Sequence, residues 1–346
     1  MSLGPLMVDI AGTALSAEDR AVLSHPLVGA VLLFSRNYTD PAQLASLTAQ
    51  IRALRTPPLL IAVDHEGGRV QRFRAGFSAL PPLQRIGRQF DADAQRGLSM
   101  ARALGWLMAA ELLACGLDFS FAPCVDLDYG RSSIIGERAL HRRAEVVAQL
   151  ASAYVHGMRD AGMAATAKHF PGHGAVVADS HLDLPVDRRE LADLDQDLLP
   201  YRRLIGAALP AVMVAHVMYA AVDARPASFS ERWVRGVLRR ELGFGGLVVA
   251  DDLSMAGAAS VGTLPQRAGL ALAAGCDLLP VCNDRAGVQR LLGELQVQPD
   301  PASQLRLVRM RGRKQVEFEN LAASAAWQSA REWLATTGAV DPSLPA

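Results

Sequence analysis

The sequence of 346 residues predicts an α/β fold, a single (β/α)8 TIM barrel with extra helices at its C-terminal end. Eight short apolar runs recur along the chain, and a stretch with a helical pattern follows each of them. The runs are mostly non-alternating, which is typical of strands buried on both faces of a parallel sheet. Strand–helix alternation indicates parallel strands with right-handed crossovers. Eight repeats favour a closed barrel, and a doubly wound open sheet is the competing architecture.

The expected strands follow one another at regular intervals. They are LMVDIAG from Leu6, GAVLLF from Gly29, LLIAVD from Leu59, DFSFAP from Asp118, AATAKHF from Ala164, PAVMVAH from Pro210, GLVVADD from Gly246 and DLLPVC from Asp277. Between them, amphipathic segments such as 93–115, 144–161 and 230–241 predict helices. We expect the barrel over about 6–295 and a helical tail packed outside it over about 300–346. Because no long Pro/Gly/Ser linker interrupts the chain, we expect one catalytic domain over 1–346.

Composition argues against several classes of protein. Lys plus Arg and Asp plus Glu both number 35, whereas a nucleic-acid-binding protein usually carries a basic excess. The four cysteines form no C-x-x-C pair and lie in apolar runs, so we expect buried, reduced thiols. No apolar run is long enough to span a bilayer, and the N-terminus lacks the basic region of a signal peptide. We therefore expect a cytoplasmic protein that binds neither nucleic acid nor membrane.

Polar residues gather at the C-terminal ends of four expected strands. They are Asp64, Lys168 with His169, His216, and Asp251 with Asp252. In a (β/α)8 barrel these ends form the active-site face. Successive side chains of a strand point to opposite sides, so at most one of Asp251 and Asp252 should face a substrate. The alternation of side chains along a strand does not tell which of the two aspartates does so. An aspartate that caps the next helix is the alternative role, and we favour it for Asp252.

Two further segments carry candidate chemistry. After KHFPGHG, at 168–174, the chain continues to Asp179-Ser180-His181. In an extended loop Asp179 can bond one nitrogen of His181 and leave the other for proton transfer, although a solvated loop histidine fits equally well. After the third expected strand, Asp64 can accept hydrogen bonds from the hydroxyl groups of a ligand, and Arg72 can donate to them. The alternative is that these charges pair with each other.

A metal-dependent hydrolase on the same barrel is a competing interpretation. Histidines 169, 173, 181 and 216, with aspartates nearby, could supply ligands. Against this, the first expected strand lacks a His-x-His pair, and Lys168 beside His169 would repel a cation. We therefore expect no metal and no other cofactor.

Taken together and in this order, the motifs resemble those of bacterial β-N-acetylglucosaminidases (β-hexosaminidases) of glycoside hydrolase family 3, of the peptidoglycan-recycling type. The resemblance covers about 6–295. The motifs that carry it are VDHEGGRVQRF, IGERAL, KHFPGHGAVVADSH, AHVMY, LGFGGLVVADDLSM and AGCDLLPVCN. Two departures are Ala250, where the family often has Ser, and His65, where it commonly has Gln.

The resemblance implies a retaining enzyme with Asp251 as nucleophile and Asp179 with His181 as the acid/base dyad. It also implies residues that hold the terminal N-acetylglucosamine (GlcNAc): Asp64, Arg72, Arg138, Lys168 and His169, with His216 and Met218 lining the subsite less directly. The implied substrate is a small carbohydrate, the muropeptide fragment GlcNAc–1,6-anhydro-N-acetylmuramic acid with or without peptide. We expect a monomer. A phosphate-using GlcNAc phosphorylase and a non-catalytic sugar-binding barrel remain as alternatives.

Overall fold

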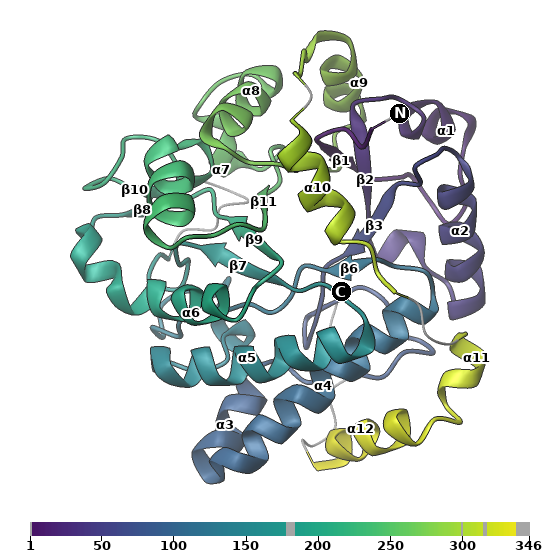
Figure 1. Cartoon of the computed structure of the whole chain (residues 1–346), viewed down its shortest axis with the longest axis vertical. Coiled ribbons are helices and arrows are strands. Elements are labelled where there is room, and N and C mark those ends of the chain that lie inside the picture. The colour runs from purple at the N-terminus through teal and green to yellow at the C-terminus, as the bar shows by residue number, and fades with distance from the viewer. Residues whose placement is uncertain (1, 178–183, 299, 314–316, 337–346) are drawn as a thin grey trace.

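The computed structural model describes residues 2–177, 184–298, 300–313 and 317–336, and two parallel sheets form its centre (Figure 1). The larger sheet has the strand order β12-β1-β2-β3-β6, and the smaller has the order β11-β9-β7. The strands of the larger sheet are β1 (Leu6–Val8), β2 (Val28–Leu33), β3 (Leu60–Val63), β6 (Phe119–Ser120) and β12 (Leu279–Val281). Those of the smaller are β7 (Thr166–Phe170), β9 (Ala211–Val214) and β11 (Leu247–Ala250).

Every one of the eight apolar runs coincides with one of these strands, although β2 begins one residue before its run, and all their pairings are parallel. Isolated parallel bridges connect the two sheets at both junctions. They join Phe119 to Ala164 and Cys124 to Lys168 on one side, and Val249 to Leu278 on the other. Strand residues are buried throughout, as expected for strands covered on both faces. The predicted α/β fold with parallel strands is confirmed.

Helices surround the strands (Figure 1). They are α1 (Ala17–Leu23), α2 (Pro41–Ala53), α3 (Gln84–Ala92), α4 (Ala94–Ala114), α5 (Ala144–Ala161), α6 (Asp195–Gly206), the π-helix η5 (Arg232–Glu241), α7 (Ala256–Ala259), α8 (Leu264–Ala274) and α9 (Arg285–Glu294). Helix α4 begins where the Asp93 side chain accepts from the Arg96 amide, and α5 ends at Gly162, whose φ is +98°. The three segments expected to be helical correspond to α4, α5 and η5.

Within the described residues 300–313 and 317–336 the chain forms three helices, α10 (Pro301–Arg309), α11 (Phe318–Leu321) and α12 (Ala325–Thr336). Figure 1 shows them outside the strands, with α12 beside α4. The Trp327 indole donates to the Glu111 carboxylate of α4 at 2.8 Å, and the Arg96 guanidinium lies 5.6 Å from the Trp333 ring. These contacts agree with the expected helical tail.

Two small strand pairs were not predicted from the sequence, because strands of only two or three residues leave no recognisable hydrophobic pattern. β4 (His65–Gly67) pairs antiparallel with β5 (Val70–Gln71), and β8 (Val186–Asp187) pairs parallel with β10 (Met218–Tyr219). The β4–β5 turn requires glycine at Gly67: its φ is +114°, and a Cβ there would lie 2.4 Å from the Pro81 oxygen. This hairpin lies between Asp64 and Arg72 in the chain.

Two expectations from composition can be compared with the structure. All four cysteines are buried and free of disulfides. In the part of the chain that the structure describes, no helix has both the length and the apolar character needed to cross a bilayer.

Candidate active site

A cavity of about 590 Å³ opens at the C-terminal ends of the strands. Its walls come from segments that follow β2, β3, β7, β11 and β12, which are far apart in the sequence. Parallel strands bring their carboxyl ends to one face, so this convergence follows from the topology. Among the residues that line it are Phe34, Asp64, Arg69, Arg72, Arg138, Lys168, His169, His173, Asp251, Asp252, Met255 and Asn283.

One wall of the cavity is a buried network of charges. The Lys168 ammonium lies 2.7 Å from Asp64 Oδ1 and 2.6 Å from Glu66 Oε1. Arg138 binds Glu66 with two parallel hydrogen bonds of 2.8 and 2.9 Å. Burial opposes the charge on Glu66, but Arg138 and Lys168 hold its pKa well below the usual range. Burial likewise opposes the Lys168 charge, but Asp64 and Glu66 raise its pKa. The network is therefore charged before any ligand arrives.

His169 extends this wall and is held in one orientation. Its Nδ1 lies 2.7 Å from Asp126 Oδ2, and the Asp126 carboxylate also accepts the backbone amides of His169 and His173. Burial tends to raise the pKa of Asp126, but the two histidines bring it down to about 2. An ionised Asp126 requires a proton on His169 Nδ1. Nε2 of that ring lies 3.4 Å from Arg138 Nη2.

Within the described ranges, one group of three side chains has metal-ligand spacing: Cys124, Asp126 and His169, whose ligand atoms lie within 4.8 Å of one another. These atoms bond to each other, because Cys124 Sγ donates to Asp126 at 3.3 Å and His169 shares the same carboxylate. Burial raises the pKa of the Cys124 thiol, whereas a metal needs the thiolate. The Arg138 guanidinium would also repel a cation. The absence of a metal stays a prediction.

A second wall of the cavity carries the two adjacent aspartates. Asp251 follows β11, and its Oδ1 accepts the Asp252 amide at 2.9 Å. Asp252 Oδ1 accepts from the Ser254 amide at 2.9 Å, the Ser254 hydroxyl at 2.8 Å and the Cys282 amide at 3.2 Å. Burial raises the pKa of Asp252 to about 7, against the effect of these donors. At neutral pH this carboxyl is therefore partly protonated.

Two expectations about these aspartates can be compared with the structure. Strand alternation predicted that at most one of the two side chains faces a substrate; both residues line the cavity, but the Asp252 carboxyl is bonded to Ser254 and Cys282, so this stays a prediction. Asp252 was expected to cap the next helix. Instead it anchors the turn through Ser254, since α7 begins only at Ala256.

Of the remaining predicted binding residues, some line the cavity and others lie outside it. Arg72 lines the cavity, with its guanidinium 5.9 Å from the Phe34 ring. His216 and Met218 lie outside the set of described residues that line it: the His216 ring is fully buried, and Met218 belongs to β10. His65 is buried against Phe73 and Phe77. The dyad residues Asp179 and His181 lie outside the described residues.

Sequence reasoning missed two buried carboxylates of the charged wall, Glu66 and Asp126, and considered the buried His173 only as a possible metal ligand. Both carboxylates carried a usable signal. Glu66 lies two positions after Asp64, on the same side of an extended strand, and Asp126 follows the fourth apolar run much as Asp64 follows the third. His173 lies within the KHFPGHG motif.

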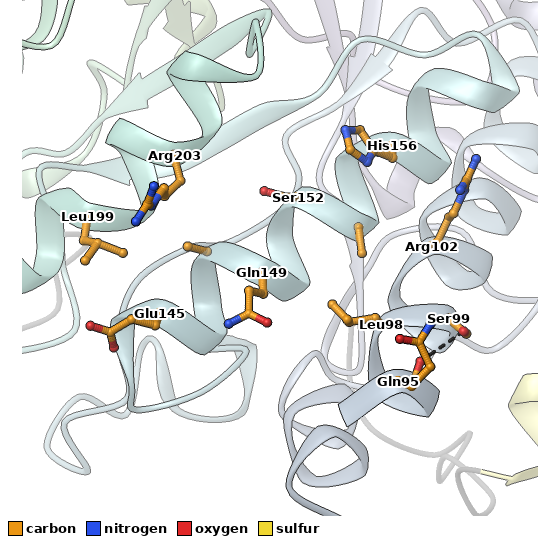
Figure 2. A pocket seen from close by; sticks show the side chains of 12 residues that line it. Gln95, Leu98, Ser99, Arg102, Glu145, Gln149, Ser152, His156, Leu199 and Arg203 are labelled. Atoms are coloured by element: carbon orange, nitrogen blue, oxygen red, sulfur yellow. Dashed lines mark hydrogen bonds between the residues drawn. The ribbon is translucent and has the colours of Figure 1, made fainter. Parts of the chain in front are cut away.

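A second cavity, of about 600 Å³, lies on the outer helices (Figure 2). Figure 2 shows Gln95, Ser99 and Arg102 of α4 facing side chains of α5 and α6 across it. Among the described residues that line it, Glu145 is the one carboxylate. Because the cavity is formed by helix surfaces rather than strand ends, it is a poorer candidate for the active site of this fold.

Comparison with known proteins agrees with the motifs. Residues 5–308 match the model of the glycosyl hydrolase family 3 N-terminal domain. The chain is 55% identical to a β-hexosaminidase of Thioalkalivibrio sulfidiphilus, over 96% of this chain and 95% of the relative. It resembles the crystal structure of NagZ from Neisseria gonorrhoeae in complex with N-trifluoroacetyl-D-glucosamine, with a TM-score of 0.92, 42% identity and coverage of 97% and 98% of the two chains. A structure of that protein in complex with a zinc ion matches with a TM-score of 0.92 and 40% identity, over 98% of this chain and 99% of that one. The chain therefore belongs to glycosyl hydrolase family 3, and the resemblance seen in its motifs is confirmed.

Proposed function

We propose that this β-N-acetylhexosaminidase is a retaining exo-enzyme that removes terminal GlcNAc from peptidoglycan fragments, GlcNAc–1,6-anhydro-N-acetylmuramic acid with or without peptide. The observation that carries the proposal is the cavity itself, in which Asp251 shares a space of about 590 Å³ with the Asp64–Lys168 ion pair. Its size and its fixed polar groups suit a small sugar. The names of the relatives and the sugar bound by the gonococcal protein support the same class of substrate.

The charged wall is assigned to sugar recognition. Asp64 accepts hydrogen bonds from sugar hydroxyls, and Lys168 and Arg138 donate to hydroxyl or acetamido oxygens. His169 presents Nε2, because its other nitrogen is bound to Asp126. Arg72 supplies further donors at the rim. Since the protein's own ion pairs already hold these groups in place, little ordering is needed when the sugar binds.

Catalysis is assigned to Asp251 and His181. In the first step the Asp251 carboxylate attacks the anomeric carbon, while His181 protonates the departing glycosidic oxygen as that bond breaks. In the second step His181 takes a proton from water, which attacks the anomeric carbon and releases Asp251. Two inversions give net retention. Asp179 orients His181. A histidine near its ordinary pKa can give and take this proton at neutral pH.

We also propose the architecture and setting that this chemistry implies. The two parallel sheets are arcs of one (β/α)8 barrel, and the bridges at both junctions support its closure. Residues 1–346 form one catalytic domain that acts as a monomer in the cytoplasm. Water is the acceptor, and neither a metal nor another cofactor takes part. The positive charges of Arg138 and Lys168 beside the candidate ligand His169 argue against the metal-dependent alternative.

The test is hydrolysis of an aryl β-N-acetylglucosaminide followed by NMR. A β-anomer as the first product supports retention, and an α-anomer as the first product overturns the mechanism. A second arm adds inorganic phosphate. Release of GlcNAc at an unchanged rate supports hydrolysis, whereas accumulation of GlcNAc-1-phosphate would assign the chain to the phosphorylases.

A further inference from the structure

His216 lies behind Asp251 and Asp252 rather than in the cavity. Its Nε2 is 3.0 Å from the Asp252 carbonyl oxygen, and its Nδ1 is 2.6 Å from Ser228 Oγ. A carbonyl oxygen can only accept a hydrogen bond, so Nε2 must carry the proton. Nδ1 then accepts from the Ser228 hydroxyl. The two partners therefore determine the tautomer of this ring.

The ring has little freedom to leave this position. It stacks on Phe229 with the two planes 4° apart and the centroids 5.1 Å apart. The Ser228 amide binds the Ala215 carbonyl at 3.2 Å, which holds the segment that carries Ser228 beside the segment that carries His216. Burial lowers the pKa of His216, so the imidazole is neutral at neutral pH.

Asp252 is held from two directions, and its amide is directed at the nucleophile. His216 and the Met255 amide, at 3.0 and 3.1 Å, both bind its carbonyl oxygen, while Ser254 and Cys282 hold its carboxyl oxygen. With both groups held, the Asp252 amide donates to Asp251 Oδ1 at 2.9 Å. The ends of β9, β11 and β12 are thereby joined at this residue.

We propose that His216 is a positioning residue: through the Asp252 backbone it holds the amide that orients the Asp251 carboxylate. The inference rests on the proposed function, in which Asp251 is the nucleophile. A donor on Oδ1 stabilises the carboxylate before attack and again when it leaves in the second step. A misaligned carboxylate slows both steps. Binding of GlcNAc is unaffected, because His216 does not reach the cavity.

Two substitutions of similar volume separate this role from packing. His216→Gln keeps a side-chain donor for the Asp252 carbonyl, and His216→Met lacks one. We expect His216→Met to lower kcat about tenfold, the scale of one aligned hydrogen bond, and His216→Gln to retain most of it. The inhibition constant of GlcNAc should stay within about twofold in both, since no contact with the sugar is lost. The acid limb of the pH–rate profile should move to higher pH in His216→Met alone.

Three results would overturn the inference. Equal losses of kcat in the Met and Gln variants would reduce His216 to a packing residue. A rise in the GlcNAc inhibition constant as large as the fall in kcat would mean that His216 contacts the sugar. If both variants fail to fold, Ser228→Ala, which leaves the ring in place, should lower kcat severalfold in the same pattern; an unchanged kcat there would also reject the inference.

A different experiment would reject the proposed function itself. A 5-fluoro glycosyl fluoride of the GlcNAc series traps the covalent intermediate, and peptide mapping locates it. A label on a residue other than Asp251 in the unsubstituted enzyme rejects the nucleophile, whatever the His216 variants do. A label on Asp251 that forms at the same rate in His216→Met as in the unsubstituted enzyme rejects only the positioning role.

Discussion

The two walls of the cavity are built differently. The binding wall, Asp64, Glu66, Arg138 and Lys168, consists of ion pairs in which every charge meets an opposite one at 2.6–2.8 Å. The nucleophile wall, Asp251 and Asp252, is held by backbone amides, by the Ser254 hydroxyl and, from behind, by the neutral imidazole of His216. Saturated ion pairs make the binding wall rigid and well placed for recognition. On the other wall a backbone dipole, the Asp252 amide, orients the Asp251 carboxylate. The comparison indicates that ion pairs serve binding and that backbone dipoles help to position the nucleophile.

The largest expected effect comes from removing Asp251, the proposed nucleophile. Asp251→Ala should lower kcat by roughly 10⁴-fold or more, since covalent catalysis has no substitute carboxylate in line. Asp252→Ala should lose much less, because it retains the amide that binds Asp251. Steady-state rates with an aryl β-N-acetylglucosaminide measure both. Equal losses would assign the nucleophile role to the pair rather than to Asp251.

The next effect concerns proton transfer. His181→Ala should lose about 10²–10⁴-fold with a disaccharide substrate. It should lose much less in the glycosylation step with a dinitrophenyl glycoside, because a good leaving group scarcely needs the proton. Asp179→Ala should show the same pattern more mildly. Pre-steady-state rates with substrates of graded leaving-group ability test this, and equal losses across the series would remove His181 from the acid role.

On the binding wall, Glu66 is the carboxylate that two cations share. Glu66→Gln leaves Lys168 and Arg138 buried with less compensation, so the free energy of unfolding should fall by about 3–5 kcal/mol, the usual cost of breaking a buried pair. Urea denaturation measures the change. Glu137→Gln, a nearby residue whose side chain is more exposed, is the matched control. A loss below about 1 kcal/mol, as for a surface pair, would mean that the network contributes little to stability.

The smallest expected effect is a change in the free energy of unfolding with pH, caused by the Asp252 carboxyl. Asp252 has a pKa of about 7 in the folded protein, above its ordinary value. Folding therefore binds a proton between about pH 4 and 7, and the stability that Asp252 contributes at low pH is lost as pH rises through 7. Relative to Asp252→Asn, the protein should lose at most about 4 kcal/mol of stability between pH 4 and 8. Urea unfolding of both proteins at each pH tests this; a difference independent of pH would contradict it.

The strands and the family were predictable from sequence, and the arrangement of the two walls was not. Buried parallel strands are apolar runs, so all eight were visible, whereas β8 and β10, of two residues each, left no pattern. Polar strand ends indicated Asp64, Lys168, His169 and Asp251. They did not indicate which way His216 points, because that depends on Ser228 and Asp252, which lie elsewhere in the sequence.

The central claim is that Asp251 becomes covalently attached to the sugar. Its most direct test is to incubate the enzyme with a 5-fluoro glycosyl fluoride of the GlcNAc series, digest the protein and sequence the labelled peptide by mass spectrometry. The account predicts one glycosyl group per chain, on Asp251 in the segment 247–253. A label on Asp252 or on any other residue, or turnover with no covalent intermediate under conditions that trap a known retaining enzyme, would contradict it.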